Sequence, residues 1–137
     1  MTRRIPSRLH RQRGDSLLET ALVMVIIFTV TFWVFEVCAL MYTHTVIADA
    51  AHEGVRYAIV HSGGDVGGTQ ARVSTFAQLS MHNVSGISTS VTFPDGSATP
   101  PNRVRVTVTY SYVPWLNNVL STVPTMHAYA EGRMVVQ

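Results

Sequence analysis

The most prominent pattern in the chain is a long run of apolar residues near its N-terminus. Residues 20–35 form sixteen consecutive positions without a charge, and after Glu36 the chain contains no Asp, Glu, Lys or Arg up to Ala48. A helix from Thr20 to Tyr42 is about 34 Å long at 1.5 Å per residue, and the hydrocarbon core of a bilayer is about 30 Å thick. Neither Pro nor Gly interrupts the stretch. We therefore predict a continuous transmembrane helix over about residues 20–42.

Two alternative interpretations fit this apolar run less well. They are a cleaved secretory signal and a buried helix of a soluble domain. A secretory signal has an apolar region of about 7–15 residues followed by a small-residue cleavage site. Here the apolar run is longer, and residues 36–39 read Glu-Val-Cys-Ala. A soluble-domain helix that is apolar on all sides must be enclosed by protein, and the roughly 90 residues that remain are too few for that. The pattern favours a membrane helix.

Beyond residue 42 the pattern becomes that of an amphipathic helix, which we expect to continue to about Val60. Apolar residues recur at three- and four-residue spacing, at Ile47, Ala50, Ala51, Val55 and Ala58. The opposite face carries Asp49, His52, Glu53 and Arg56. Because Glu53 and Arg56 are three positions apart, they are placed to form a local ion pair. This polar face is either a surface that contacts a partner or a solvated helix face.

The remainder of the chain predicts a small mixed domain. Four glycines between residues 61 and 68 indicate a flexible loop. Residues 69–82 then have the spacing of a short amphipathic helix, whose inward positions are Val73, Phe76, Ala77 and one of Leu79 and Met81. Residues 88–93 and 103–113 flank a connection rich in Pro and Gly and are expected to pair as a hairpin.

The second strand of this hairpin alternates between apolar and polar positions. Val104, Val106, Val108, Tyr110 and Tyr112 face one way, and Arg103, Arg105, Thr107, Thr109 and Ser111 face the other. Residues 126–136 are expected to supply a third strand. We predict an α+β fold, with a long N-terminal helix, a short second helix and a small antiparallel sheet of about three strands. The corresponding segments are a helix over 15–60, a loop over 61–68 and an α+β domain over 69–137.

Charge is divided unevenly along the chain. The 137 residues contain ten arginines, no lysine and eight acidic residues, for a formal charge of +2. Half of the arginines precede the first acid, at Arg3, Arg4, Arg8, Arg11 and Arg13. From Asp15 onward, five arginines stand against eight acids, which gives −3. The basic character belongs to a short arm, so we exclude a broadly basic nucleic-acid-binding domain. Positive residues on one side of the apolar run predict a cytoplasmic N-terminus.

The junction between the arm and the apolar run combines a glycine with a carboxylate. Gly14 ends the basic arm, and Glu19 lies five residues further on, at the start of the apolar run. An acidic residue at the centre of a membrane helix costs about 2.5–3.5 kcal/mol on insertion scales, and such residues usually have a partner. The alternative is that Glu19 extends to the membrane surface or interacts favourably with the helix N-terminal dipole.

This junction resembles that of the type IV pilin class. The resemblance implies that a prepilin peptidase cuts after Gly14, that residues 1–14 are a basic cytoplasmic leader and that Asp15 becomes the first residue. It also implies that Glu19 pairs with the terminal amine of a neighbouring subunit during assembly. An ammonium and a carboxylate that meet in lipid compensate each other, and their pairing would set the axial register between subunits.

Within that class the chain is similar to the TadE-like proteins of tight adherence (Flp) pilus systems. The similarity is carried by residues 13–23, by the Ala-rich helix end at 48–58, and by the strand-like segment 104–113 with the Ala-rich segment 128–133. Many relatives have an aromatic residue just after the Glu and a Pro a few residues on, where this chain has Thr20 and Val25. The helix is therefore expected to be straighter than in those relatives.

The resemblance implies a minor pilin or pseudopilin that supports pilus biogenesis and surface adhesion. A major pilin of this system is expected to be far shorter. The implied partners are the prepilin peptidase, other pilin-like subunits, the pilus assembly platform and membrane lipid, without nucleic acid or a small-molecule substrate. The implied location is the bacterial cytoplasmic membrane, as a single-pass protein with an extracytoplasmic C-terminal domain. The alternative is an uncleaved, membrane-anchored protein with a small extracytoplasmic binding domain, for which Gly14 has no role.

No pattern in the sequence indicates an enzyme, a metal site or a cofactor. The six histidines do not form a His-Glu-x-x-His motif, and no Gly-x-Ser-x-Gly turn is present. The single cysteine, Cys38, excludes an intramolecular disulfide and a cysteine-based zinc cluster. Glu36 is the second acid of the apolar region, about 26 Å along the helix from Glu19. It either lies near the outer interface, where it is hydrated, or contacts a partner helix, as we also consider for His52, Glu53 and Arg56.

Overall fold

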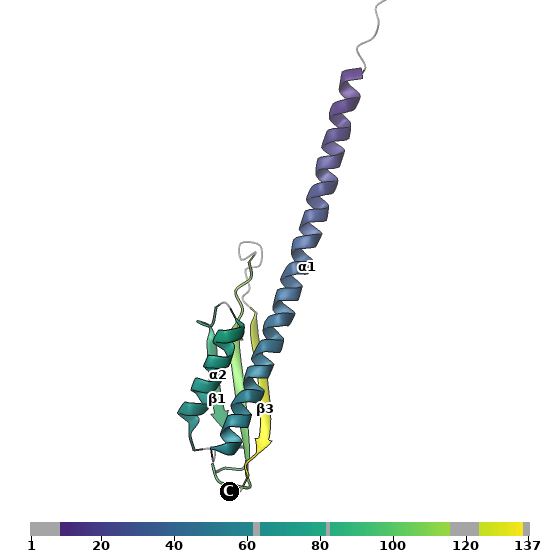
Figure 1. The fold of residues 1–137 in the computed structure, drawn as a ribbon. Helices are drawn as coiled ribbons and strands as arrows, with labels where there is room; N and C mark the ends of the chain where they lie inside the picture. The colour runs from purple at the N-terminus through teal and green to yellow at the C-terminus, as the bar shows by residue number, and fades with distance from the viewer. Residues whose placement is uncertain (1–8, 62–63, 82, 116–123, 136–137) are drawn as a thin grey trace, which may run out of the picture. The chain divides into compact units, whose positions relative to one another are not determined.

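A computed structural model describes residues 9–61, 64–81, 83–115 and 124–135, with the side chains of 9–14 excepted. The described elements are α1 (Leu9–Val60), α2 (Val66–Ser80), β1 (Ile87–Thr92), β2 (Arg103–Ser111) and β3 (Thr125–Arg133) (Figure 1). The chain divides into two compact units, Met1–Val37 and Cys38–Gln137. We call these the N-terminal unit and the C-terminal unit. The predicted α+β fold is confirmed.

Helix α1 contains the apolar run and the amphipathic segment that follows it. It covers the predicted helix over 15–60, ends at Val60 as predicted, and extends at its N-terminal end to Leu9. Three threonine hydroxyls in its apolar part, on Thr20, Thr29 and Thr31, donate to the carbonyl four residues earlier at 2.7–2.8 Å. These bonds satisfy the hydroxyl protons within the helix, so the polar groups of the threonines do not prevent the helix from lying in lipid.

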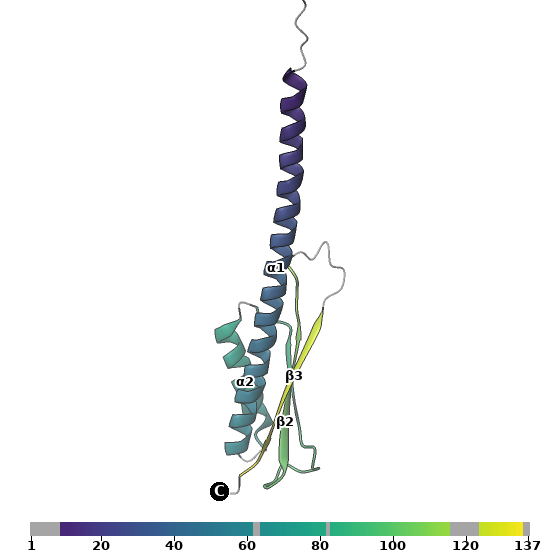
Figure 2. The same ribbon diagram turned by 90° about the vertical axis from the view of Figure 1, so that its right-hand side faces the viewer.

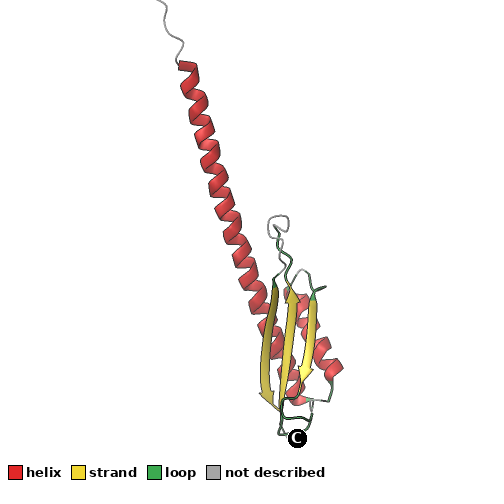
Figure 3. Ribbon diagram, turned by 180° about the vertical axis from the view of Figure 1, so that it is seen from behind, coloured by secondary structure: helices red, strands yellow, loops and turns green. Residues whose placement is uncertain are grey.

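The sheet belongs to the C-terminal unit and has the strand order β1-β2-β3, with both pairs antiparallel (Figure 3). Its register pairs Arg103 with Arg133 at one end of β2 and β3, and Ser111 with Thr125 at the other. The three predicted strands are present with small shifts at their ends. Strand β3 ends at Arg133 instead of continuing to residue 136.

The core lies between one face of the sheet and the two helices, which cover that face in the C-terminal unit (Figure 2). The alternation predicted for β2 is confirmed, because Val104, Val106 and Val108 are fully buried. The apolar positions predicted on α1 are also buried, with Ile47, Ala50 and Ala51 at 0 % exposure. Burial of a Val or Ile side chain contributes about 1.5–3 kcal/mol, so this layer is the main source of stability of the unit.

Two glycines allow α1 to approach its neighbours closely. A Cβ atom on Gly54 would come within 2.6 Å of the Val73 side chain on α2 and 3.2 Å of Val106 on β2. A Cβ atom on Gly132 of β3 would come within 2.6 Å of Val55. Small residues at these two crossings are therefore a condition for the observed packing of α1.

Helix α2 starts earlier than the glycine pattern predicted. Asp65 caps its N-terminus and accepts a hydrogen bond from the Gly68 backbone N–H at 2.8 Å. The cap draws Gly67 and Gly68 into the first turn, which shortens the predicted loop. Val73 and Ala77 are buried as predicted. Of the two alternatives for a further inward position, Met81 packs against the core, whereas Leu79 is 84 % exposed. The helix ends at Ser80, and Met81 is the half-buried residue that follows it.

Candidate processing and assembly segment

The proposed processing site lies within a helix. Helix α1 begins at Leu9, so the backbone of Gly14 and Asp15 is helical. Arg11 and Arg13 also belong to this first part of α1, while Arg3, Arg4 and Arg8 lie outside the described residues. A glycine inside a helix costs about 1 kcal/mol relative to alanine. The helix is therefore expected to unfold more easily at Gly14 than at the neighbouring residues.

The N-terminal unit exposes apolar side chains on all sides of α1. Every residue from Asp15 to Phe35 is exposed, and large apolar side chains such as Leu17 and Leu18 are 73 % and 70 % exposed. This is the one helix among the described residues that is long and apolar enough to cross a membrane, and its most apolar window has a mean hydropathy of 2.4. Such a surface suits lipid or neighbouring apolar helices.

Glu19 is a carboxylate within this apolar surface. Its side chain is exposed, and it forms no ion pair or hydrogen bond with any residue that the structure describes. Leu18, Leu22 and Val23 adjoin it on the helix and are exposed as well. The residue is thus available to a group from outside the chain, as the interaction with a neighbouring subunit requires. The described part of the chain does not itself supply that group.

Glu36 differs from Glu19 in its surroundings. Its side chain is half-buried and interacts with other groups in the structure. The two acids of the apolar region are therefore not equivalent, because one is exposed among apolar side chains and the other is already engaged. A contact of Glu36 with a partner helix stays a prediction.

The ion pair predicted on the outer part of α1 has a different partner. Both Nε and Nη2 of Arg72 on α2 donate to Glu53 Oε1, at 3.1 and 2.9 Å, and the predicted Glu53–Arg56 pair is wrong. Glu53 is half-buried because α2 packs beside it. His52 and Arg56 remain exposed on the same helix. Glu53 thus links the two helices, and contacts of His52, Glu53 and Arg56 with a partner stay predictions.

A polar cluster joins the end of α1 to the start of α2. The Tyr57 hydroxyl donates to Asp65 Oδ2 at 3.0 Å, and the His61 ring stacks on Tyr57 with 3.9 Å between ring centroids. The hydrogen bond from Gly68 N–H, followed by that from Tyr57, holds the pKa of the Asp65 carboxyl below its usual value. The hydrogen bond to Asp65 raises the pKa of Tyr57. The cluster ties the last turn of α1 to the cap of α2.

A second set of charges lies on the open face of the sheet, and its pairing was not predicted from the sequence. Arg103 Nη2 contacts Asp95 Oδ1 at 2.9 Å, and Arg105 pairs with Glu131 of the neighbouring strand. Arg105 also lies over the Tyr129 ring, with 5.5 Å to its centroid. The Arg103 side chain is the main cause that lowers the pKa of Asp95. These contacts tie the β1–β2 connection and β3 to β2.

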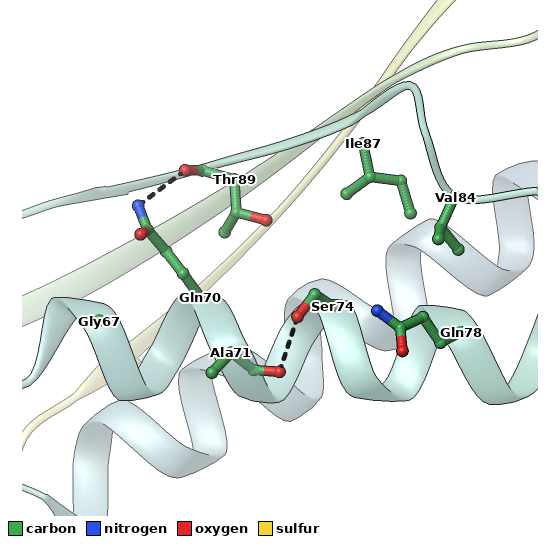
Figure 4. A pocket seen from close by; sticks show the side chains of 8 residues that line it. All are labelled: Gly67, Gln70, Ala71, Ser74, Gln78, Val84, Ile87 and Thr89. Atoms are coloured by element: carbon green, nitrogen blue, oxygen red, sulfur yellow. Dashed lines mark hydrogen bonds between the residues drawn. The ribbon is translucent and has the colours of Figure 1, made fainter.

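A polar groove lies between α2 and β1 in the C-terminal unit. It has a volume of 480 Å³ and is lined in part by Gln70, Ser74, Gln78 and Thr89 (Figure 4). The Gln70 amide already donates to the Thr89 carbonyl at 3.1 Å. The described residues of the lining include no acid, base or nucleophilic cysteine, so they offer no side chain suited to general acid–base catalysis.

The described histidines, acids and cysteine do not assemble into a metal site. No group of three or more such side chains able to hold an ion is found among the described residues. His127 instead contacts the Thr109 hydroxyl at 3.1 Å on the open sheet face, and His61 contacts the Tyr57 carbonyl at 3.0 Å.

Comparison with known proteins gives a family match that lies within α1. No curated protein and no solved structure matches the chain. A protein-family model described as TadE-like protein matches residues 14–56. The match begins at Gly14, covers Glu19 and the apolar run, and ends in the part of α1 that packs on the sheet. The predicted resemblance to the TadE-like family is thus confirmed for residues 14–56.

Proposed function

We propose that the chain is a minor pilin or pseudopilin-like subunit of a tight adherence pilus apparatus, in which it has a structural or assembly role. The TadE-like match indicates a pilin-like protein associated with this pilus, a family whose members are generally structural and not enzymes. The observation that carries the proposal is the coincidence of that match with a helix whose apolar surface is exposed on all sides. Such a helix supports a single membrane anchor.

In this proposal the arginines of the arm keep the N-terminus in the cytoplasm, and the C-terminal unit is extracytoplasmic. The prepilin peptidase cuts after Gly14. Because peptidases bind their substrates as extended chain, the first turns of α1 must open before the cut. The helix-weakening effect of Gly14 supports opening at this position.

Glu19 then acts in assembly. Its exposed carboxylate meets the amine of a neighbouring subunit in a medium of low dielectric constant, where an unpaired charge is costly. The apolar surface around it packs against the helices of other pilin-like subunits. The family match and this surface support partners of this kind, and we include support of adhesion through the pilus in the proposal.

The proposal is tested by complementation of a strain from which the gene is deleted. Pili sheared from the cells are quantified with wild-type protein, with Glu19→Ala and with the matched control Gln78→Ala, which truncates an exposed side chain of the same length on α2. We expect wild type and Gln78→Ala to restore pili and Glu19→Ala to fail, although it is cleaved and inserted normally. Normal pili without the gene would contradict the assembly role, and normal pili with Glu19→Ala would remove the register role from this residue.

A further inference from the structure

A second groove lies at the end of the C-terminal unit where α1 enters it. This groove has a volume of 490 Å³ and is bordered by α1, by the end of α2 and by the segment after β2. Its lining includes four aromatic residues, Tyr42, Tyr110, Tyr112 and Trp115. Among the described residues that line it, none carries a formal charge. This composition is unlike that of the polar groove between α2 and β1.

The rim of this groove presents large apolar side chains to the outside. Trp115 is 89 % exposed, Tyr42 is 60 % exposed and Val113 is 53 % exposed. The Tyr42 hydroxyl donates to the Ser80 carbonyl at 3.0 Å, which places the last turn of α2 and its exposed Leu79 beside the rim. We call Tyr42, Leu79, Val113 and Trp115 the aromatic edge.

Formal charges in the sheet gather at the opposite end. The register pairs Arg103 with Arg133 and Arg105 with Glu131, far from Ser111 and Thr125 at the other end of the same two strands. Asp95 contacts Arg103 and therefore belongs to the charged end. The packing of α1 agrees with this placement, because Gly132, which lies next to Arg133 at the charged end of β3, contacts Val55 near the C-terminal end of α1. In the described residues, the sheet thus has formal charges at one end and none at the end that borders the groove.

Chain connectivity determines which end is closer to the membrane. The groove is lined by Ala39, Tyr42 and Thr43, which follow the apolar run without a break in α1. If the hydrocarbon core begins near Thr20, its thickness of about 30 Å ends near residue 40. The aromatic edge then lies at the level of the outer headgroups, where Trp and Tyr side chains are most favourable.

We propose that the aromatic edge inserts into the boundary between headgroups and acyl chains of the membrane that α1 crosses. Trp115 and Val113 are the inserting side chains, and Tyr42 and Leu79 flank them. The inference rests on the proposed membrane insertion of α1 and adds a second attachment to it. Two attachments restrict how the C-terminal unit tilts and turns on the membrane before it joins other subunits.

The bilayer is favoured over a second copy of the chain as the occupant. A specific protein interface usually combines apolar contacts with matched hydrogen bonds and charges at its rim. The aromatic edge has no charged group to match. The interfacial zone of a bilayer accepts apolar side chains with polar tips in many orientations. Because the four side chains of the edge are uncharged, insertion is expected to be equally strong with zwitterionic and with anionic lipids.

Intrinsic fluorescence of the full chain in lipid nanodiscs tests this inference. The chain has two tryptophans, so Trp33→Phe leaves Trp115 as the sole reporter and Trp115→Phe leaves Trp33. A third chain has both replaced and carries Tyr129→Trp, so that its reporter lies on the open sheet face. We expect Trp115 to emit at shorter wavelength than this introduced tryptophan and to be quenched more strongly by lipids labelled near the headgroup. Acrylamide, a quencher dissolved in water, is expected to quench the introduced tryptophan more strongly.

The control distinguishes failure of this inference from failure of the proposed anchor. If Trp33 is quenched by lipids labelled deep in the acyl chain while Trp115 is quenched only from water, α1 is inserted and the aromatic edge is free, which overturns the inference. If Trp33 is also quenched only from water, the proposed anchor itself is wrong. Protection of Trp115 that disappears on dilution of the protein in lipid would show contact with another copy and would overturn the inference too.

Discussion

Gly54 is the residue that sets how closely α1 approaches both α2 and the sheet. A methyl group at this position would meet the Val73 side chain at 2.6 Å, and Val73 is fully buried. We expect Gly54→Ala to destabilise the C-terminal unit, because overpacking costs about 1–3 kcal/mol. That cost exceeds the gain in helix propensity of about 1 kcal/mol. Thermal unfolding of the full chain in detergent micelles, followed by near-ultraviolet circular dichroism, measures the change.

Gly67→Ala is the matched control for this substitution. Gly67 is also helical and exposed, and a Cβ there would meet the Asp65 carboxylate at an ordinary distance of 3.9 Å. We expect it to be neutral or to raise the unfolding midpoint, because only the propensity gain applies. Equal midpoints for Gly54→Ala and wild type would show that the crossing is looser than the structure indicates.

Asp65 gives the stability of the C-terminal unit a defined dependence on pH. Its pKa in the folded chain lies below the ordinary 3.8, mainly because of the Gly68 hydrogen bond. Its stabilising contribution is therefore complete above that ordinary value and is lost as the pH falls through the lower folded pKa. The pKa of Tyr57 is raised above 10.0, so its contribution is present below pH 10.0 and is lost as the pH rises through the folded pKa.

Asp65→Asn separates this effect from other acids such as Asp95. Asparagine keeps the capping acceptor but has no charge to titrate. We expect the unfolding midpoint of wild type to fall more than that of Asp65→Asn when the pH is lowered from neutral to below 3.8. If the unfolding midpoints of the two proteins fall equally as the pH is lowered, Asp65 has the same pKa in the folded and unfolded chain.

At the scale of elements, the contact between α1 and α2 combines a packed centre with an ion pair at its margin. The Arg72 side chain is 55 % exposed and that of Glu53 is 22 % exposed, so solvent screens the pair. We expect a double-mutant cycle of Glu53→Ala and Arg72→Ala to give a coupling of about 0.2–1 kcal/mol. A coupling of zero would show that the two helices are aligned by apolar packing without help from these charges.

The elements whose residues follow a strict period were predictable from the sequence. In β2, the alternation of valines and tyrosines with polar residues predicted the buried face correctly, and in α1 the spacing of Ile47, Ala50 and Val55 did the same. In both cases one face is buried and the other is not, so the spacing of the apolar residues indicates which side chains are buried. At the end of α2 the spacing left Leu79 and Met81 as alternatives, and Met81 is the one that packs against the core.

Features that depend on tertiary contacts were not predictable. The i,i+3 spacing favoured Arg56 as the partner of Glu53, but the observed partner Arg72 is nineteen positions away. Helix α2 starts at Val66 because Asp65 caps its N-terminus, although Gly67 and Gly68 in the first turn have low helix propensity. The Asp95–Arg103 contact and the Arg105–Glu131 pair required the strand register. The roles of Gly14 and Glu19 were predicted from a local sequence pattern and stay predictions.

At the scale of the whole molecule, the proposed cut after Gly14 accounts for the uneven charge. It removes five arginines and no acid, so a chain with formal charge +2 becomes one with −3. The basic arm would serve insertion and then leave the protein. The remaining chain would begin at Asp15, with Glu19 as its fifth residue, inside the segment that matches the TadE-like family. Membrane anchoring, subunit contact and the folded unit would then all be connected by α1.

The N-terminus of the protein in cell membranes tests this account most directly. The chain is recovered from cells that contain the prepilin peptidase, and its mass and first residue are determined beside those from cells without the peptidase and from the Gly14→Val variant. The account predicts a chain that begins at Asp15 only when the peptidase and Gly14 are both present. A full-length chain with residues 1–14 still attached in peptidase-containing cells would contradict it.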